Sequence, residues 1–161
     1  METQRIKNLG WSRIPRPAFF WGLAGILPFA GLTLAQIFGA ASDAAMIEQA
    51  LIAYGALILT FIGGVHWGLA MRAGIDAQAI RQSAQDWQLY TTGILPSLVG
   101  FGAVLTGGVL AFLLLIGGFF ALLAYDLRLV RRGVASQWYA PLRIVLTIAV
   151  TFCLGLAVSY A

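Results

Sequence analysis

Five long apolar runs, with basic residues beside only one end of each, set the strongest limit on how this chain can fold. They cover 18–38, 47–71, 88–106, 108–127 and 141–160. An α-helix of roughly 20 apolar residues crosses the hydrocarbon core of a bilayer. Only 10% of the residues are charged, whereas a typical soluble domain carries about 25%. We therefore expect an all-α integral membrane protein, a five-helix transmembrane bundle that forms one transmembrane domain over 1–161, with a basic N-terminal tail at 1–17.

The ten Lys and Arg residues all lie on one side of these spans. They occur in the N-terminal tail, in the second and fourth connections, and one turn into the fifth run as Arg143. The positive-inside rule then places the N-terminus inside, in the cytoplasm or the mitochondrial matrix, and the C-terminus outside. Because membrane orientation accounts for the net charge of +4, we expect the lipid bilayer as a partner and no nucleic acid.

Two pairs of segments within the chain are similar to each other. GLAGILPFAGL (22–32) shares Gly-Ile-Leu-Pro with YTTGILPSLVG (90–100), and FIGGVHWGLA (61–70) shares Ile-Gly-Gly and Leu-Ala with LIGGFFALLA (115–124). This similarity favours a parallel repeat of helices one and two by helices three and four. Chance similarity is the alternative, because glycine and leucine are common throughout the chain. Only TGGV separates the third and fourth runs, which predicts an antiparallel hairpin there.

The single histidine, His66, lies within the second run among small residues. At about 100° per residue it faces Gly63 and Ala70, whereas Gly64 and Gly68 form a GxxxG pair that lets a neighbouring helix approach closely. Three interpretations of the imidazole remain open: a hydrogen bond to a carbonyl, Thr, Tyr or Asp of another helix, a contact with a quinone or lipid headgroup, or axial ligation of haem. One histidine supplies only one axial ligand, which disfavours haem, and no Cys, His or carboxylate cluster accompanies it for zinc. We therefore predict no cofactor and no metal site.

Asp126 ends the fourth run, within the segment AYDLRLV. An ionised carboxylate at membrane depth needs a partner, and Arg72 and Arg143 lie at a similar depth. We predict that Asp126 pairs with one of these two arginines. The pair is interpreted either as a structural connection between helices or as part of a proton-transfer path.

Pro28 and Pro96 lie near the middle of the first and third runs. We expect each to interrupt its helix, because proline lacks the backbone N–H that the helix needs. Interrupted helices occur at transporter sites, but no ionisable residue lies at the bilayer centre to couple transport to an ion or proton. The sequence also has no Gly-rich phosphate loop, nucleophile elbow or pair of facing carboxylates. These absences argue against an enzyme.

Several motifs resemble, in the same order, those of an uncharacterised membrane family. They are GILPF, YGALILTFIGGVHWGLA, LPSL, YDLR and WYAPLRIVLT, which together run from about residue 15 to 155. The family is a domain-of-unknown-function family of proteobacteria, similar to the one that includes mitochondrial transmembrane protein 69. The resemblance implies a multi-helix bundle in the bacterial inner (cytoplasmic) membrane, or in the mitochondrial inner membrane of a eukaryote, and it supplies no activity. The residues that match its motif positions are Tyr54, Gly63, Gly64, His66, Trp67, Gly68, Pro96, Asp126, Arg143 and Thr147.

We expect a non-enzymatic inner-membrane protein that acts as an accessory subunit or assembly factor of a larger membrane complex. Its small size, small-residue helix faces and five Trp residues at the inner boundary favour other membrane subunits, or a second copy, as partners. The alternative is a binding protein or carrier for a small ligand (quinone, lipid or haem), with an inward-facing pocket around His66. Besides His66, the candidate residues for ligand binding or interaction are Trp67, Tyr90, Asp126, Arg72 and Arg143, and the expected helix-packing residues are Gly63, Gly64, Gly68, Pro28 and Pro96.

Overall fold

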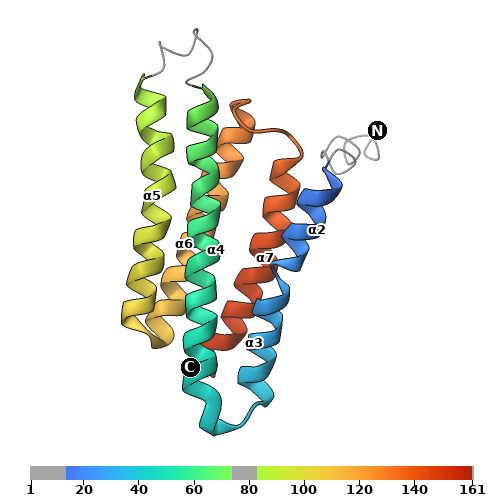
Figure 1. Ribbon diagram of the computed structural model, residues 1–161, viewed down its shortest axis with the longest axis vertical. Coiled ribbons are helices and arrows are strands. Elements are labelled where there is room, and N and C mark those ends of the chain that lie inside the picture. The colour runs from blue at the N-terminus through green and yellow to red at the C-terminus, as the bar shows by residue number, and fades with distance from the viewer. Residues whose placement is uncertain (1–13, 74–82, 161) are drawn as a thin grey trace.

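The computed structural model describes residues 14–73 and 83–160, and this part of the chain is a bundle of helices lying side by side (Figure 1). The basic N-terminal tail expected at 1–17 lies mostly outside the described residues. The elements are α2 (Arg16–Ala24), α3 (Leu27–Phe38), the short 3₁₀ helix η2 (Ala41–Asp43), α4 (Ala44–Ala73), α5 (Ser83–Thr106), α6 (Gly108–Arg131) and α7 (Tyr139–Val158).

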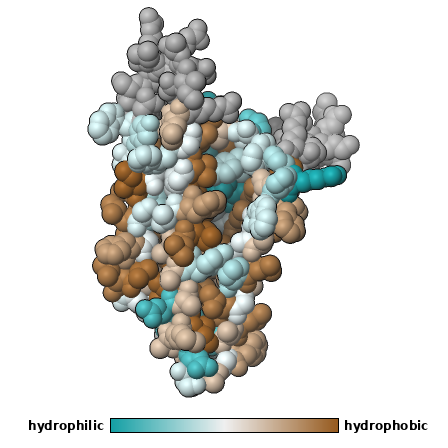
Figure 2. All heavy atoms as spheres, viewed as in Figure 1, coloured by the Kyte–Doolittle hydropathy of each residue, from teal (hydrophilic) through white to brown (hydrophobic). Residues whose placement is uncertain are grey.

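Five helical segments are long and apolar enough to cross a membrane. They are Arg16–Phe38, Ala41–Met71, Trp87–Thr106, Gly108–Arg131 and Tyr139–Val158. The expected all-α, five-helix transmembrane bundle is therefore confirmed. Large apolar side chains such as Phe38, Phe61 and Leu105 are exposed, and brown and pale groups cover most of the face drawn in Figure 2. In a membrane protein, such side chains face lipid.

The two ends of the bundle carry opposite charges. At one end α2, α5 and α7 begin and α4 and α6 finish (Figure 1). We call it the basic end, because the described residues there include Arg16, Arg128, Arg131 and Arg132. The other end carries Asp43 and Glu48, and the backbone N–H of Gly108 donates to Glu48 Oε1 at 2.9 Å. The start of α2 and the end of α7 lie at opposite ends (Figure 1), whereas the compartment that each end faces stays a prediction.

The first span is broken between α2 and α3, as Pro28 predicted. Pro28 is the second residue of α3. Its ring has no N–H to donate to the carbonyl of Ala24 and would clash with that carbonyl in a continuous helix. The break leaves backbone carbonyls that need other donors. Tyr54 of α4 supplies one, because its hydroxyl donates to the Gly25 carbonyl at 3.1 Å.

The expectation that Pro96 also interrupts its helix is wrong, since α5 continues through it from Ser83 to Thr106. Pro96 removes the helical donor of the Thr92 carbonyl, four residues earlier, but the His66 ring of α4 lies 3.4 Å from that oxygen. Neighbouring helices re-satisfy freed carbonyls in this way within membranes. Helix α4 also lies close by, because a Cβ on Gly63 would be 3.1 Å from Pro96 Cγ. The parallel repeat stays a prediction.

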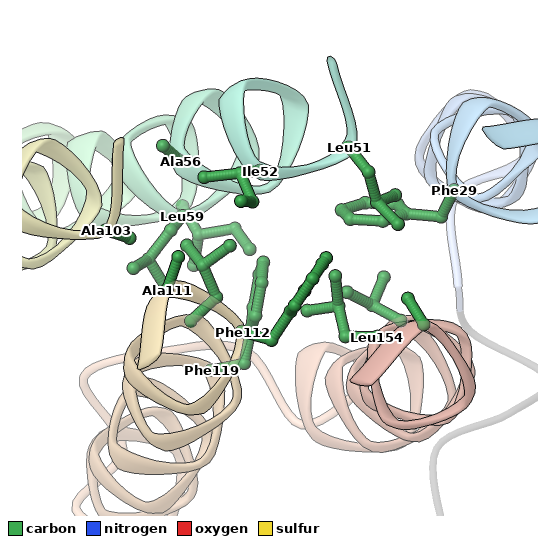
Figure 3. Packing of buried hydrophobic residues seen from close by; sticks show 14 of the residues in the cluster. Phe29, Leu51, Ile52, Ala56, Leu59, Ala103, Ala111, Phe112, Phe119 and Leu154 are labelled. Carbon is green, nitrogen blue, oxygen red and sulfur yellow. The ribbon is translucent and has the colours of Figure 1, made fainter. Parts of the chain in front are cut away.

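Helix α4 is central and packs against α3, α5 and α6. Buried side chains from α3, α4, α5, α6 and α7 fill the middle of the bundle (Figure 3). The Phe29 ring of α3 packs edge-on against Tyr54 at 4.9 Å and against Phe119 at 6.3 Å between ring centroids. Such edge-to-face pairs stabilise by about 0.5–1.5 kcal/mol beyond the area they bury.

The turn between α5 and α6 consists of glycine in a left-handed conformation. Gly107 and Gly108 have φ values of 62° and 56°, which glycine adopts without steric cost. The two helices that this turn joins, α5 and α6, pack against each other. The antiparallel hairpin predicted from TGGV is therefore confirmed.

Candidate functional site

Three buried polar side chains from three different helices meet inside the bundle. His66 of α4 and Asp126 of α6 are 0% exposed, and Arg143 of α7 is 3% exposed. His66 Nε2 lies 2.8 Å from Asp126 Oδ1, and Arg143 Nε donates to Asp126 Oδ2 at 2.6 Å. The ion pair predicted for Asp126 is present, with Arg143 as its partner. The side chain of Arg72 lies outside the described residues. We call His66, Asp126 and Arg143 the polar triad.

Helix periodicity brings the triad inward together with apolar neighbours. Phe119, Leu122 and Asp126 are buried along one face of α6, and Arg143 and Thr147 along one face of α7. Residues three or four apart share a helix face. An isolated charge buried here would be very unfavourable, so the charged members depend on each other.

Both ring nitrogens of His66 face oxygen atoms of other helices. Its Nδ1 faces the Thr92 carbonyl, which can only accept, at 3.4 Å, and its Nε2 faces Asp126. Asp126 also accepts from Arg143 through its other oxygen, as an ionised carboxylate does. His66 therefore links Asp126 of α6 to the Thr92 carbonyl of α5.

Tyr125, Trp67 and Tyr90 surround this region without joining the triad's hydrogen bonds. The Tyr125 ring lies edge-on to His66 at 5.1 Å. Trp67 and Tyr90 form their own edge-on pair, also at 5.1 Å, between α4 and α5. Trp67 packs onto Gly93, where a Cβ would lie 2.6 Å from the indole Nε1. The predicted ligand-binding candidates thus fall into two groups, the triad and the Trp67–Tyr90 pair.

A cavity of about 110 Å³ lies beside the triad, where the broken first span passes α4, α6 and α7. Of the candidates named from the sequence, only Arg143 lines it. Its other lining residues are Trp21, Gly22, Gly25, Ile26, Ile58, Phe61, Ile62, Phe119, Leu146, Thr147 and Val150. We call this space the triad cavity. Trp21 and Phe61 are 71% and 74% exposed and belong to membrane-spanning segments, so the triad cavity reaches the side of the bundle that faces lipid.

Two polar atoms on residues that line the triad cavity have no hydrogen-bond partner among the described residues. They are Arg143 Nη2 and Thr147 Oγ1. The two residues are 3% and 1% exposed. An unsatisfied buried polar group costs about 1–3 kcal/mol. The sequence pointed to Thr147 only through the family resemblance. Its position four residues after Arg143 is the signal that could have placed both on one face.

No group of three or more His, Cys, Asp or Glu side chains that could hold a metal ion occurs within the described parts of the chain. The triad supplies one imidazole and one carboxylate, and an arginine that occupies the carboxylate's second oxygen.

Comparison with known proteins confirms the resemblance seen in the sequence. The chain is 34% identical to transmembrane protein 69 of Xenopus tropicalis over 143 residues, which cover 87% of this chain and 53% of that protein. It is 29% identical to transmembrane protein 69 of Mus musculus over 136 residues, covering 83% of this chain and 52% of that protein. The chain thus spans about half the length of these relatives. No solved structure matches it. The model of the family described as "Protein of unknown function (DUF3429)" matches residues 14–159, and the chain belongs to this family of membrane proteins.

Proposed function

We propose that this membrane protein binds a lipid-soluble small molecule in the triad cavity and performs no chemistry on it. The observation that carries the proposal is the pair of unpartnered buried groups, Arg143 Nη2 and Thr147 Oγ1, on residues that line an otherwise apolar space. Ligand sites typically combine apolar walls with a few convergent polar groups. A ligand whose oxygen reaches these two atoms would satisfy both donors and remove that cost.

The cavity chemistry favours a ligand with a carbonyl or other oxygen acceptor on an apolar body. The guanidinium and the hydroxyl both donate, so a quinone carbonyl or the polar head of a lipid fits them. A volume of about 110 Å³ admits a head and a few carbon atoms, with the remainder lying past Trp21 and Phe61 in the bilayer. Haem is not favoured, because both ring nitrogens of His66 already face oxygen atoms of the protein.

Thr147→Val and Thr151→Val form a matched pair of test variants. Both remove a buried hydroxyl from α7, but Thr151 already donates to the Thr147 carbonyl at 2.8 Å within its own helix. Purified protein in lipid nanodiscs is titrated with decylubiquinone, and its thermal midpoint is recorded at each concentration. In addition, co-purifying molecules are extracted and identified by mass spectrometry.

We expect decylubiquinone, or an extracted lipid added back, to stabilise the wild type. Thr147→Val should weaken that binding roughly threefold to tenfold, the effect of one hydrogen bond, and should leave the unliganded midpoint unchanged or higher. Thr151→Val should bind as the wild type does. The proposal fails if no stoichiometric molecule co-purifies and no probe shifts the midpoint, or if the two variants weaken binding equally.

A second candidate function is an accessory subunit or assembly factor of a larger membrane complex. Gly64 and Gly68 support it, because a Cβ on either glycine would meet no atom within 4 Å. Small residues let helices approach each other closely in membranes. Gly64→Leu/Gly68→Leu should release a partner on a native gel after gentle detergent extraction, whereas Gly117→Leu, at an equally open glycine on α6, should not. A monomeric wild-type band with no co-purifying protein would contradict this function.

We further propose that the protein lies in an inner membrane, bacterial or mitochondrial, with its basic end inside. Positive charge beside the spans supports this orientation. With Cys153 replaced by serine, Ser136→Cys at the basic end and Ser42→Cys at the opposite end give a matched pair for a membrane-impermeant thiol reagent. Only Ser42→Cys should react in intact cells or organelles. Reaction of Ser136→Cys alone would reverse the orientation.

A further inference from the structure

A second hollow lies at the basic end, between α5 and α6. Its volume is about 420 Å³, and it shares no lining residue with the triad cavity. The lining residues are Trp87, Gln88, Thr91, Thr92, Tyr125, Arg128, Leu129 and Arg132. We call it the basic pocket.

The basic pocket carries positive charge, and the described residues that line it include no carboxylate. Arg128 lies in the last turn of α6, and Arg132, four residues later, is the C-cap residue that follows it. Residues four apart at a helix end lie on the same side. Neither takes part in an ion pair with another described residue. Two guanidinium groups on one wall present several N–H donors, which suit the oxygen atoms of a phosphate group.

The remaining lining residues suit the depth of lipid headgroups. Trp87 is 76% exposed and, with Tyr125, places an amphipathic ring beside the arginines. Tryptophan and tyrosine occur characteristically at this depth. Gln88 and Thr91 add polar groups on the α5 wall, which can contact the ester or glycerol part of a lipid.

An apolar track continues from the basic pocket toward the bundle centre. Thr91, Leu95 and Leu98 fall at helix-face spacing along α5, and the two leucines are 50% and 60% exposed. An acyl chain lying along these leucines would keep its headgroup at the arginines. This track favours a phospholipid over a free phosphate ion, because a free phosphate ion has no apolar part to pack against the leucines.

We propose that the basic pocket binds the headgroup of an anionic phospholipid, with Arg128 and Arg132 holding its phosphate. Basic pockets between transmembrane helices at an inner membrane face are suited to such headgroups. The site is separate from the triad cavity and does not depend on a ligand there.

The test compares Arg128→Gln/Arg132→Gln with Arg131→Gln, which lies on the same helix at the same end but outside the pocket lining. The wild type and the variants are prepared in phosphatidylcholine micelles and titrated with short-chain phosphatidylglycerol, and binding is read from the thermal midpoint. Inorganic phosphate is titrated in a parallel arm. Circular dichroism in phosphatidylcholine alone establishes that each variant is folded.

Affinity of the double variant for phosphatidylglycerol should fall roughly tenfold or more, since each arginine near an anionic surface contributes about a further severalfold. Arg131→Gln should stay within about twofold of the wild type, since it alters only the diffuse surface charge. Arg128→Lys/Arg132→Lys, which keeps the charge, should retain most of the binding, and the single variant Arg132→Gln replaces the double variant if the latter does not fold.

Two results would overturn the inference. Equal weakening by Arg131→Gln would mean that net charge, rather than the pocket, attracts the lipid. Binding of inorganic phosphate as tight as that of phosphatidylglycerol would mean that the acyl track plays no part and that a free anion is the ligand.

Discussion

Replacing Asp126 with asparagine tests whether the triad is held by charge or by hydrogen bonds alone. Asparagine has nearly the same shape as aspartate. Its amide oxygen can still accept from Arg143 Nε, which lies 2.6 Å from Asp126 Oδ2 in the wild type, and its side chain can still contact His66. What it removes is the negative charge facing a guanidinium that is 3% exposed. The variant therefore leaves a buried cation without its counter-ion.

The expected loss of stability follows from comparing two kinds of interaction. A hydrogen bond between transmembrane helices contributes about 0.6 kcal/mol on average, and about 1.7 kcal/mol at most. Breaking a buried ion pair by removing one partner costs about 3–5 kcal/mol, because the remaining charge is left uncompensated. Asp126→Asn should thus lower the free energy of unfolding by about 3–5 kcal/mol.

The assay is reversible unfolding in mixed micelles, titrated with dodecyl sulfate and followed by circular dichroism. Asp126→Asn/Arg143→Met removes both charges and should recover most of the lost stability. Asp43→Asn, at an exposed carboxylate at the opposite end, serves as the control and should change stability by less than about 0.5 kcal/mol. A loss below about 1 kcal/mol for Asp126→Asn, or no recovery in the double variant, would refute the assignment of a charge-dependent triad.

Two further results are expected. Gly93→Ala should destabilise by about 1–3 kcal/mol, since its Cβ would meet the Trp67 ring, whereas Gly64→Ala meets nothing within 4 Å and should leave the thermal midpoint unchanged. Tyr54→Phe removes the donor to the Gly25 carbonyl and should cost about 0.6 kcal/mol in the same unfolding assay; a loss above about 2 kcal/mol would mean that the hydroxyl has another role.

The spans could be predicted from the sequence because a bilayer imposes a length and an apolar composition on each of them. The break at Pro28 followed from a local steric rule. The effect of Pro96 did not, because the same rule leaves open whether a neighbour supplies the missing donor. Here His66 does so from α4, 26 residues earlier in the chain. That contact depends on the packing of α4 against α5, which no local pattern contains.

The site was only partly accessible to sequence reasoning, for a similar reason. Asp126 required a cation, and only two arginines lay at its depth, so one half of the triad could be predicted. That the same carboxylate also binds His66 depends on the relative rotation of α4, α6 and α7. The sequence did not predict the triad cavity. The cavity forms where the first span is broken, beside Gly22 and Gly25, and it is also lined by Thr147 of another helix. The amino-acid composition cannot predict a cavity that depends on how residues of several helices are placed in space.

Asp126 links the stability of the bundle to the proposed ligand site. Its carboxylate accepts from His66 with one oxygen and from Arg143 Nε with the other, which fixes the plane of the guanidinium and leaves Nη2 unpartnered among the described residues. If the ion pair only holds helices together, Asp126→Asn should reduce stability while the folded fraction binds ligand as the wild type does. If it also orients Arg143 toward the cavity, ligand affinity of the folded fraction should fall although Asp126 does not line the cavity. We expect the second result, because a guanidinium held by one charged contact loses its orientation when that contact weakens, whereas Thr147→Val should lower affinity with no loss of stability.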